Sequence, residues 1–308
     1  MRILLVAEES AGMRCLKELV KAEHQIVGVV ASPDCGTAKA PSVWRTAQAM
    51  GLRRWPVENV RRDTFAPTMA AEDLDVILNV HSLYVIRESV LACARLGAFN
   101  LHPGPLPRYA GLNAPSWAIY NGEKTHGVTL HKMAAGIDTG AIVFETLFDI
   151  AEEDTGLTVM TKCIKLGIPL IGRLLETLDR DPASLPLAPQ DLSHRRYYGR
   201  EVPRNGRLCW ARPAERIIRF VRASNYYPFA SPWGHPTARL NGRDIGIVKA
   251  GLTGRAAEGP PGTVTSSDPD GVTIACADEA ISVRAIRLEA EVVAAAEVFQ
   301  VGQRLHDG

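Results

Sequence analysis

The sequence has no excess of charge of either sign. Among its 308 residues, 35 are Lys or Arg and 34 are Asp or Glu, so the formal net charge is +1. This balance excludes a general electrostatic attraction to nucleic acid or anionic membranes, but it is compatible with a local basic patch. Aromatic residues make up only 6% of the chain, which argues against a broad base-stacking surface.

Long apolar runs and paired cysteines are also missing. The first apolar run ends at Glu8 and Glu9, too early for a signal peptide, and no segment approaches the ~20 apolar residues of a membrane span. The six cysteines are spread along the chain without a C-x-x-C pair, which disfavours a disulfide framework or a zinc site. We therefore expect a cytoplasmic protein that has no membrane partner and binds no metal.

Several widespread catalytic motifs are absent. The turn after the first expected strand reads EESAG, so there is no G-x-G-x-x-G there and a standard NAD-binding site lacks support. The chain also contains no Walker A motif, no H-E-x-x-H and no G-x-S-x-G. Phosphoryl transfer, zinc proteolysis and serine hydrolysis therefore lose their usual sequence support.

Strands that alternate with helices predict a doubly wound, mostly parallel α/β sheet in the first part of the chain. The expected strands are 2–7, 25–31, 53–57, 74–80, 97–102, 127–133 and 141–150. One expected helix is capped by Ser42 and reaches about residue 50. The other expected helices are 13–23, 89–94, 114–121 and 158–179.

The composition changes after residue 181. Residues 182–207 are rich in proline and arginine, which suits a linker. Beyond them, a helix at 213–223 precedes several short strands, and the pairs Asn241-Gly242 and Asp270-Gly271 are turn signals between strands. We predict a first, catalytic domain over residues 1–181, a linker over 182–207, and a small OB-like β-barrel over 208–308.

The stretch 99–140 carries polar groups suited to acyl transfer. Asn100 and His102 lie two residues apart on an expected strand, so their side chains project to one face at its carboxyl end. Asp138 follows in a loop whose Gly136 and Gly140 permit tight turns. An amide, an imidazole and a carboxylate suit attack by an amine on a carbonyl, because they can bind an oxyanion, move protons, and orient or charge the imidazole. Taken singly, these residues are more often ordinary turn and strand-end residues.

The combined pattern resembles the tetrahydrofolate-dependent formyltransferase family. The matching segments are N-L-H-P-x-x-L-P-R-Y-x-G after a strand, then a helix, then G-V-T-x-H-x-M-x-x-G-I-D-T-G. The family includes methionyl-tRNA, glycinamide ribonucleotide and amino-sugar formyltransferases. The resemblance implies that Asn100, His102 and Asp138 are the catalytic triad. It also implies a Rossmann-type first domain and N10-formyltetrahydrofolate as formyl donor, with tetrahydrofolate as product.

The resemblance also indicates the residues that surround the folate and the acceptor amine. One segment matches the place where the family's backbone receives the pterin edge, and two loops match those beside the folate. The folate residues implied in this way are Ser82, Leu83, Tyr84, Val85, Ile86, Gly104, Pro105, Leu106, Pro107, Ala134, Ala135, Gly136, Ile137 and Asp138. The residues expected at the acceptor are Tyr109, Leu112, Asn113 and Trp117, with helix packing as the alternative role.

The chain departs from the family pattern at two places that concern the acceptor. Ala110 and Leu112 stand where relatives carry arginines suited to phosphate or carboxylate recognition. Residues 32–40, where the tRNA enzymes have a basic insertion, are short and contain only Lys39 as a cation, which weighs against tRNA. The alternative basic patch is a run in the linker: His194, Arg195, Arg196, Arg200, Arg204 and Arg207.

We therefore predict an N-formyltransferase that acts on a small-molecule primary amine. The acceptor is either an amino sugar, with a sugar nucleotide as its carrier, or an amino-acid-derived amine held on a carrier protein. The alternatives are a methionyl-tRNA formyltransferase, a formyltetrahydrofolate hydrolase whose triad directs water, and a non-catalytic folate-binding module. The second domain is expected to bind substrate, to form a homodimer or only to stabilise the protein.

Overall fold

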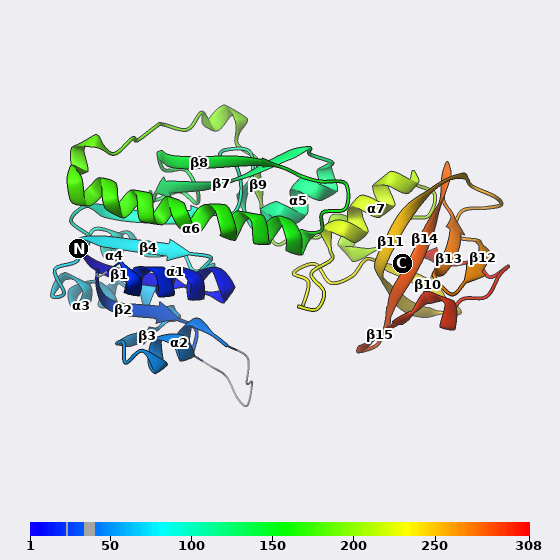
Figure 1. The fold of residues 1–308 in the computed structure, drawn as a ribbon, viewed down its shortest axis with the longest axis horizontal. Coiled ribbons are helices and arrows are strands. Elements are labelled where there is room, and N and C mark those ends of the chain that lie inside the picture. The colour runs from blue at the N-terminus through cyan, green and yellow to red at the C-terminus, as the bar shows by residue number, and fades with distance from the viewer. Residues whose placement is uncertain (23, 34–40) are drawn as a thin grey trace. The chain divides into compact units, whose positions relative to one another are not determined.

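The computed structural model describes residues 1–22, 24–33 and 41–308 (Figure 1). The chain forms two compact units: residues 1–111, 127–148 and 162–197 make the first, and residues 112–126, 149–161 and 198–308 make the second. Cys35 and Lys39 lie outside the described residues. Within the described residues, no helix has both the length and the apolar character needed to cross a membrane.

The first unit is built on a seven-stranded sheet of order β3-β2-β1-β4-β5-β7-β8. Strands β3, β2, β1, β4 and β5 pair in parallel, and β7 is antiparallel to β5. The prediction of a doubly wound, mostly parallel sheet is confirmed. The strands are β1 (Arg2–Ala7), β2 (Gln25–Ala31), β3 (Arg54–Pro56), β4 (Val76–Val80), β5 (Gly97–His102), β7 (Thr125–Lys132) and β8 (Ile142–Asp149).

The helices that follow these strands are α1 (Glu9–Lys21), α2 (Val43–Ala49), α3 (Ala66–Ala70), α4 (Glu88–Leu91), α5 (Ala114–Asn121) and α6 (Gly156–Arg180). The Ser42 side chain accepts a hydrogen bond from the Arg45 amide, which confirms the expected cap of α2. Helix α1 begins at Glu9 rather than at the expected Met13. The reason is Gly12, where a Cβ atom would stand only 2.8 Å from the side chains of Ala7 and Val43, so close packing overrides its poor helix propensity.

The two faces of the sheet bury different elements. On one face, Leu4, Val6 and Ile77 pack with Phe65 and Met69 from the segments around α3. The other face carries α6, because a Cβ atom on Gly167 of that helix would touch the side chains of Leu101 and Val128. Each large apolar side chain buried in this way contributes about 1.5–3 kcal/mol. Since side chains alternate along a strand, Asn100 and His102 face away from α6.

The second unit contains α7 (Ala214–Ala223) and an antiparallel sheet of order β12-β13-β14-β11-β10-β16, with β15 on β14. Its strands are β10 (Thr237–Leu240), β11 (Arg243–Ala256), β12 (Val264–Asp268), β13 (Gly271–Ala275), β14 (Glu279–Leu288), β15 (Glu291–Ala294) and β16 (His306–Asp307). Asn241 and Gly242 both have positive φ, at 51° and 78°, as a tight hairpin turn requires.

This sheet curves into a half-barrel (Figure 1), and the end of the chain closes against it. Strand β16 pairs with β10, and just before it the amide of Leu305 donates to the carbonyl of Gly262, beside β12. The last residues thus contact both edges of the sheet. The predicted small β-barrel is confirmed in this antiparallel half-barrel form.

Ordered structure also runs through residues 182–207. It consists of the 3₁₀ turns η3 (Pro182–Ser184), η4 (Leu192–His194) and η5 (Pro203–Gly206) and of β9 (Tyr197–Tyr198), which pairs with the short strand β6 (Ala110–Gly111). A composition rich in proline predicts the absence of long elements here, but it does not reveal this pairing. The domain boundaries at 181/182 and 207/208 stay a prediction.

Candidate active site

Three neighbouring strands bring polar side chains together around Asn100. Asn79 of β4 lies beside Asn100 of β5 in the parallel register, and His131 of β7 lies on the other side. The Asn79 Nδ2 donates to Asn100 Oδ1 at 2.9 Å, and the Asn100 Nδ2 lies 3.0 Å from His131 Nε2. Asn79, Asn100 and His131 are all buried, so these contacts form in a low-dielectric setting that strengthens them.

The neighbours of Asn100 determine which way its amide points. Because Asn79 donates to Oδ1, the Nδ2 group must face His131 and Asp138. His131 Nδ1 lies 3.0 Å from the carbonyl oxygen of Lys132, which can only accept. The proton of a neutral His131 therefore sits on Nδ1, and its Nε2 accepts from Asn100. Sequence reasoning missed Asn79 and assigned no role to His131, since only strand register places them here.

His102 is held in one orientation by the loop that follows its strand. Its Nε2 lies 2.6 Å from the carbonyl oxygen of Tyr109, so Nε2 carries the proton. Its Nδ1 lies 3.6 Å from Asp138 Oδ2. Burial lowers the pKa of His102 below its ordinary value, and the Asp138 carboxylate opposes that effect. The ring is therefore neutral near pH 7, with an unprotonated Nδ1 beside a carboxylate.

Asp138 enters the same cluster from the loop between β7 and β8. Its Oδ2 accepts from the Gly111 amide at 2.8 Å, and its Oδ1 lies 3.3 Å from Asn100 Nδ2 and 3.4 Å from His131 Nε2. Burial alone would raise the pKa of this carboxyl. The positive charge that His102 carries in the acid range where a carboxyl titrates, together with His131 and the Gly111 amide, instead holds it well below its usual range. Asp138 is therefore an anion at any physiological pH. The three residues of the predicted triad thus converge.

Two residues of the predicted linker hold the Asp138 loop. Gln190 Nε2 donates to the carbonyl oxygens of Asp138 at 3.0 Å and of Gly140 at 2.6 Å. Arg195 Nη2 donates to the carbonyl oxygen of Ile137 at 3.0 Å. Asp138 has a φ of 53°, a conformation that a non-glycine residue keeps only when its surroundings impose it. Sequence reasoning placed both residues in a linker, and Arg195 in a basic run; no local signal reveals contacts with a loop so distant in the chain.

The predicted folate segments expose apolar side chains next to buried polar atoms. Leu83 is 74% exposed and Val85 is 59% exposed, while Ser82 and Ile86 are buried; in the second loop Ile137 is 44% exposed. Within the described residues, Asn79 Oδ1 and Ser82 Oγ are buried without a hydrogen-bond partner. Apolar side chains that can cover a flat ring, beside unpaired polar atoms, suit the donor–acceptor edge of a pterin.

The loop after His102 is anchored to β7. Thr129 Oγ1 donates to the Gly104 carbonyl at 2.8 Å and accepts from the Leu106 amide at 3.2 Å. Gly104, Pro105 and Leu106 are buried, and Pro107 is half-buried. This anchoring places the Tyr109 carbonyl where it meets His102. The side chain of Tyr109 itself is only 1% exposed, and its predicted contact with the acceptor stays a prediction.

The other predicted acceptor residues belong to the second unit. Trp117 stacks on Tyr198, with ring centroids 4.7 Å apart, and meets Trp233 and Tyr120 edge to face. Leu112 and Asn113 are half-buried at the start of α5, where Asn113 has a φ of 56°. Trp117 therefore packs within an aromatic cluster of its own unit, and its contact with an acceptor stays a prediction.

Comparison with known proteins agrees with this combination of sheet, site and half-barrel. Residues 1–172 match the formyl transferase family, and residues 202–304 match the formyl transferase C-terminal domain. A methionyl-tRNA formyltransferase of Thiobacillus denitrificans is 30% identical over all of this chain and 98% of its own length. The fold and the matches together define a folate-dependent formyltransferase enzyme. The chain belongs to the formyl transferase family.

Solved structures share the fold at lower identity. WlaRD, a sugar 3N-formyltransferase solved with dTDP and 5-N-formyl-tetrahydrofolate, is 18% identical with a TM-score of 0.70, over 92% of this chain and 97% of its own. An N-formyltransferase of Helicobacter canadensis, solved with folinic acid and dTDP-3-aminofucose, is also 18% identical, with a TM-score of 0.67 over 91% and 98%. HypX of Aquifex aeolicus, solved with tetrahydrofolic acid, is 20% identical with a TM-score of 0.68; the match covers 97% of this chain but only 46% of HypX.

Proposed function

We propose that this protein transfers the formyl group of N10-formyltetrahydrofolate to the primary amine of a small molecule, in the cytoplasm. The observation that carries the proposal is the convergence of Asn100, His102 and Asp138 at the carboxyl end of β5, with contacts between 2.6 and 3.6 Å among these residues and the backbone around them. The proposal divides the chain into a catalytic domain (1–181), a linker (182–207) and a C-terminal domain (208–308).

The folate-binding part of the proposal rests on the two loops beside this cluster. Ser82 to Ile86 and Ala134 to Asp138 would hold the pterin, with Leu83, Val85 and Ile137 against its faces and the backbone at its edge. Gly104 to Pro107 would form a rigid wall, because Thr129 ties this loop at two backbone atoms. The bound folate supplies the formyl carbon that the amine attacks. Asn79 links the first loop to the catalytic cluster, since its Nδ2 lies 2.9 Å from Asn100 Oδ1 and 3.4 Å from the Ser82 carbonyl.

The cluster assigns a separate task to each side chain. Asn100 Nδ2 donates a hydrogen bond to the oxygen that gains negative charge, in place of its 3.3 Å contact with Asp138. His102 is neutral because burial lowers its pKa, so its Nδ1 accepts the proton that the attacking amine loses. Asp138 stabilises the resulting imidazolium across 3.6 Å. His102 then returns the proton to the departing nitrogen.

Single alanine variants test this assignment. Removal of an oxyanion donor costs about 10²–10³ in rate and removal of a general base about 10²–10⁴, so Asn100→Ala and His102→Ala should each lose at least a hundredfold. Asp138→Ala should fall into the same range. The assay screens amino sugars and carrier-bound amino acids for formylated product by mass spectrometry. His306→Ala, at an exposed position in β16, is the matched control. Near-wild-type transfer by any of the three variants would refute the assignment.

Reactions without an amine acceptor give different products. A hydrolase would release formate from formyltetrahydrofolate at the same rate with and without amines. A non-catalytic folate-binding module would bind folate and turn over nothing across the amine panel. Both outcomes contradict amine transfer, and they differ from each other in formate release.

A second acceptor, initiator methionyl-tRNA, is favoured by a specific feature of the second unit. Arg204, Arg207, Arg212 and Arg216 are exposed and line one small hollow. Among the described residues, none of the four lies within ion-pair distance of a carboxylate, so the hollow is a concentrated positive patch that suits phosphate groups. The 30% identity to a methionyl-tRNA formyltransferase points the same way.

The tRNA alternative is decided by a direct comparison of acceptors. Formylation of charged initiator tRNA is measured beside the best small amine, at low and high salt. If tRNA is the acceptor, Arg207→Gln together with Arg212→Gln lowers its kcat/KM about tenfold or more and weakens the salt dependence. If a small amine is the acceptor, charged tRNA is not formylated at a rate that competes with it.

A further inference from the structure

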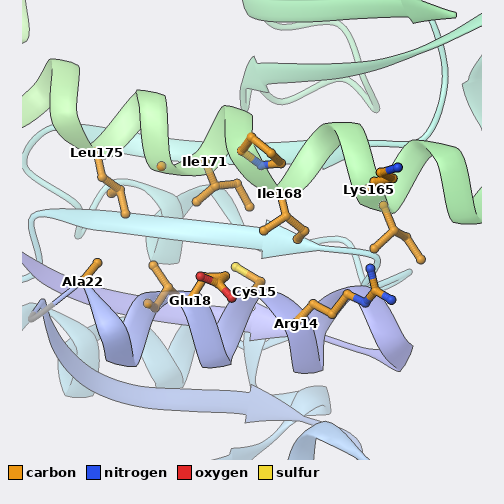
Figure 2. Close-up of a pocket in the computed structure, with 12 residues that line it drawn as sticks. Arg14, Cys15, Glu18, Ala22, Lys165, Ile168, Ile171 and Leu175 are labelled. Carbon is orange, nitrogen blue, oxygen red and sulfur yellow. The ribbon is translucent and has the colours of Figure 1, made fainter.

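A surface groove lies between α1 and α6 (Figure 2). It is on the sheet face that α6 covers, opposite the face of the catalytic cluster. Its volume is about 460 Å³, within the range of small-molecule sites. Leu101 points towards α6, where a Cβ atom on Gly167 would contact its side chain, whereas Asn100 and His102 point to the other face. The groove is therefore separate from the proposed folate site, and binding in it does not depend on the proposed function.

The floor of the groove is apolar and uncharged. Leu19 of α1 and Ile171 and Leu175 of α6 are each no more than 3% exposed, and Ile168 is half-buried above them. Cys15 also lines the floor, and burial raises the pKa of its thiol to about 12. No charge develops there at physiological pH, so the floor suits an alkyl chain rather than a polar ligand.

Positive charge gathers at one end of the groove. Arg14 of α1 and Lys165 of α6 both lie at that end (Figure 2), and neither is within ion-pair distance of a carboxylate among the described residues. Glu18, which also lines the groove, has its charge paired with Lys21 at 2.8 Å. The two unpaired cations at the end of an apolar floor complement an anionic head group.

Small residues keep the groove open along its length. A Cβ atom placed on Gly172 would meet nothing within 4 Å, and Ala22 stands at the far end (Figure 2). From Arg14 to Ala22 the helix rises about 12 Å, a distance that an extended alkyl chain of about ten carbon–carbon bonds spans. A glycine in the middle of a helix costs about 1 kcal/mol relative to alanine, so an open Gly172 is not explained by the stability of α6.

We propose that this groove binds a linear amphipathic anion, a medium-chain fatty carboxylate. The carboxylate lies between Arg14 and Lys165, and the alkyl chain lies along Leu19, Ile171 and Leu175 and over Gly172. The site is formed by one copy of the chain and is distinct from the site for the formyl donor.

Isothermal titration calorimetry with decanoate tests the proposal, with decan-1-ol as the uncharged probe of the same length. The wild type should bind decanoate at least about tenfold more tightly than decanol, because the alcohol loses the charge-assisted contacts. The Cβ atom of Gly172→Leu would meet nothing within 4 Å, and the rest of its side chain would take up space in the groove, so this variant should weaken decanoate binding at least about tenfold. Arg14→Gln with Lys165→Gln should lower the affinity for decanoate to that for decanol and leave decanol unchanged.

Matched variants and a second measurement keep the test decisive. Lys17→Gln, at an exposed position of α1 that does not line the groove, should bind decanoate as the wild type does. Circular dichroism confirms that Gly172→Leu is folded. Equal affinities for decanoate and decanol, or wild-type binding by Gly172→Leu, would overturn the proposal. So would a dimer in sedimentation that Gly172→Leu converts to a monomer without any decanoate binding, because the groove would then be an interface between two copies.

Discussion

Replacement of Gln190 by methionine should loosen the catalytic loop while it leaves the global fold nearly as stable. Gln190 Nε2 donates to two loop carbonyls, those of Asp138 and Gly140, at 3.0 and 2.6 Å. Methionine keeps the length of the side chain and removes both donors. The loop then depends on the single bond from Arg195 to Ile137 and on the contacts of the Asp138 carboxylate.

The magnitude follows from a count of the bonds. Each hydrogen bond contributes about 1 kcal/mol net, so local opening of the loop should become easier by about 2 kcal/mol, or about thirtyfold. For global unfolding the loss is partly offset, because Gln190 Oε1 is buried without a partner in the described part of the chain. Methionine relieves this cost of about 1–3 kcal/mol. The free energy of unfolding should therefore change by no more than about 1 kcal/mol.

Hydrogen exchange at one backbone amide reports the loop directly and needs no acceptor substrate. The Gly111 amide donates to Asp138 Oδ2 at 2.8 Å, so its exchange should accelerate about thirtyfold in Gln190→Met. Gln48→Met is the matched control, since Gln48 is exposed and accepts a single bond from Arg54. Unchanged exchange at Gly111, or a loss of unfolding free energy as large as the local effect, would contradict the assigned role of Gln190.

Further outcomes are expected at the catalytic cluster and at two glycines. Asn79→Leu should lower kcat at least about tenfold with little effect on unfolding, because Leu keeps the shape of Asn and Asn100 loses the bond that orients its amide. A wild-type kcat in Asn79→Leu would contradict this role. The rate should fall as the pH drops through the pKa of His102, which burial places below its ordinary value of 6.5. In Asp138→Asn this pKa should move lower still, because the carboxylate that raises it is gone. A pH–rate profile of each protein checks both outcomes. Gly140→Ala should lower the free energy of unfolding, measured in urea, by more than about 2 kcal/mol, since its Cβ would overlap the Lys132 carbonyl. Gly172→Ala should raise it by about 0.5–1 kcal/mol, because a Cβ atom there meets nothing within 4 Å.

Local patterns in the sequence were sufficient for most of the fold. The alternation of buried strands with amphipathic helices predicted β1, β2, β4 and β5 within a few residues, and Ser42 and Asn241-Gly242 marked a helix start and a hairpin. These signals succeed because hydrophobic periodicity and turn chemistry act over short stretches of chain. The early start of α1 was missed because the close approach around Gly12 involves Val43, which lies in another helix.

The candidate site also contains residues that the sequence predicted and residues that only the structure revealed. Asn100 and His102 could be paired from the sequence alone, because residues two positions apart on a strand share a face. Asp138 was a candidate from its glycine-bordered loop, and the family resemblance joined it to this pair and added the folate loops. Sequence alone could not supply Asn79 and His131, which reach Asn100 only through the register of β4 and β7. Nor could it supply Gln190, whose contact with Asp138 spans 52 residues of chain.

The sequence by itself determined the family, the class of chemistry and the catalytic candidates, because short motifs carry them. Tertiary structure decided the protonation and orientation of those candidates. The Tyr109 carbonyl places the proton of His102 on Nε2, and burial keeps the ring neutral. Both effects depend on how strands and loops distant in sequence pack around one imidazole. The local sequence pattern around His102 does not determine that packing.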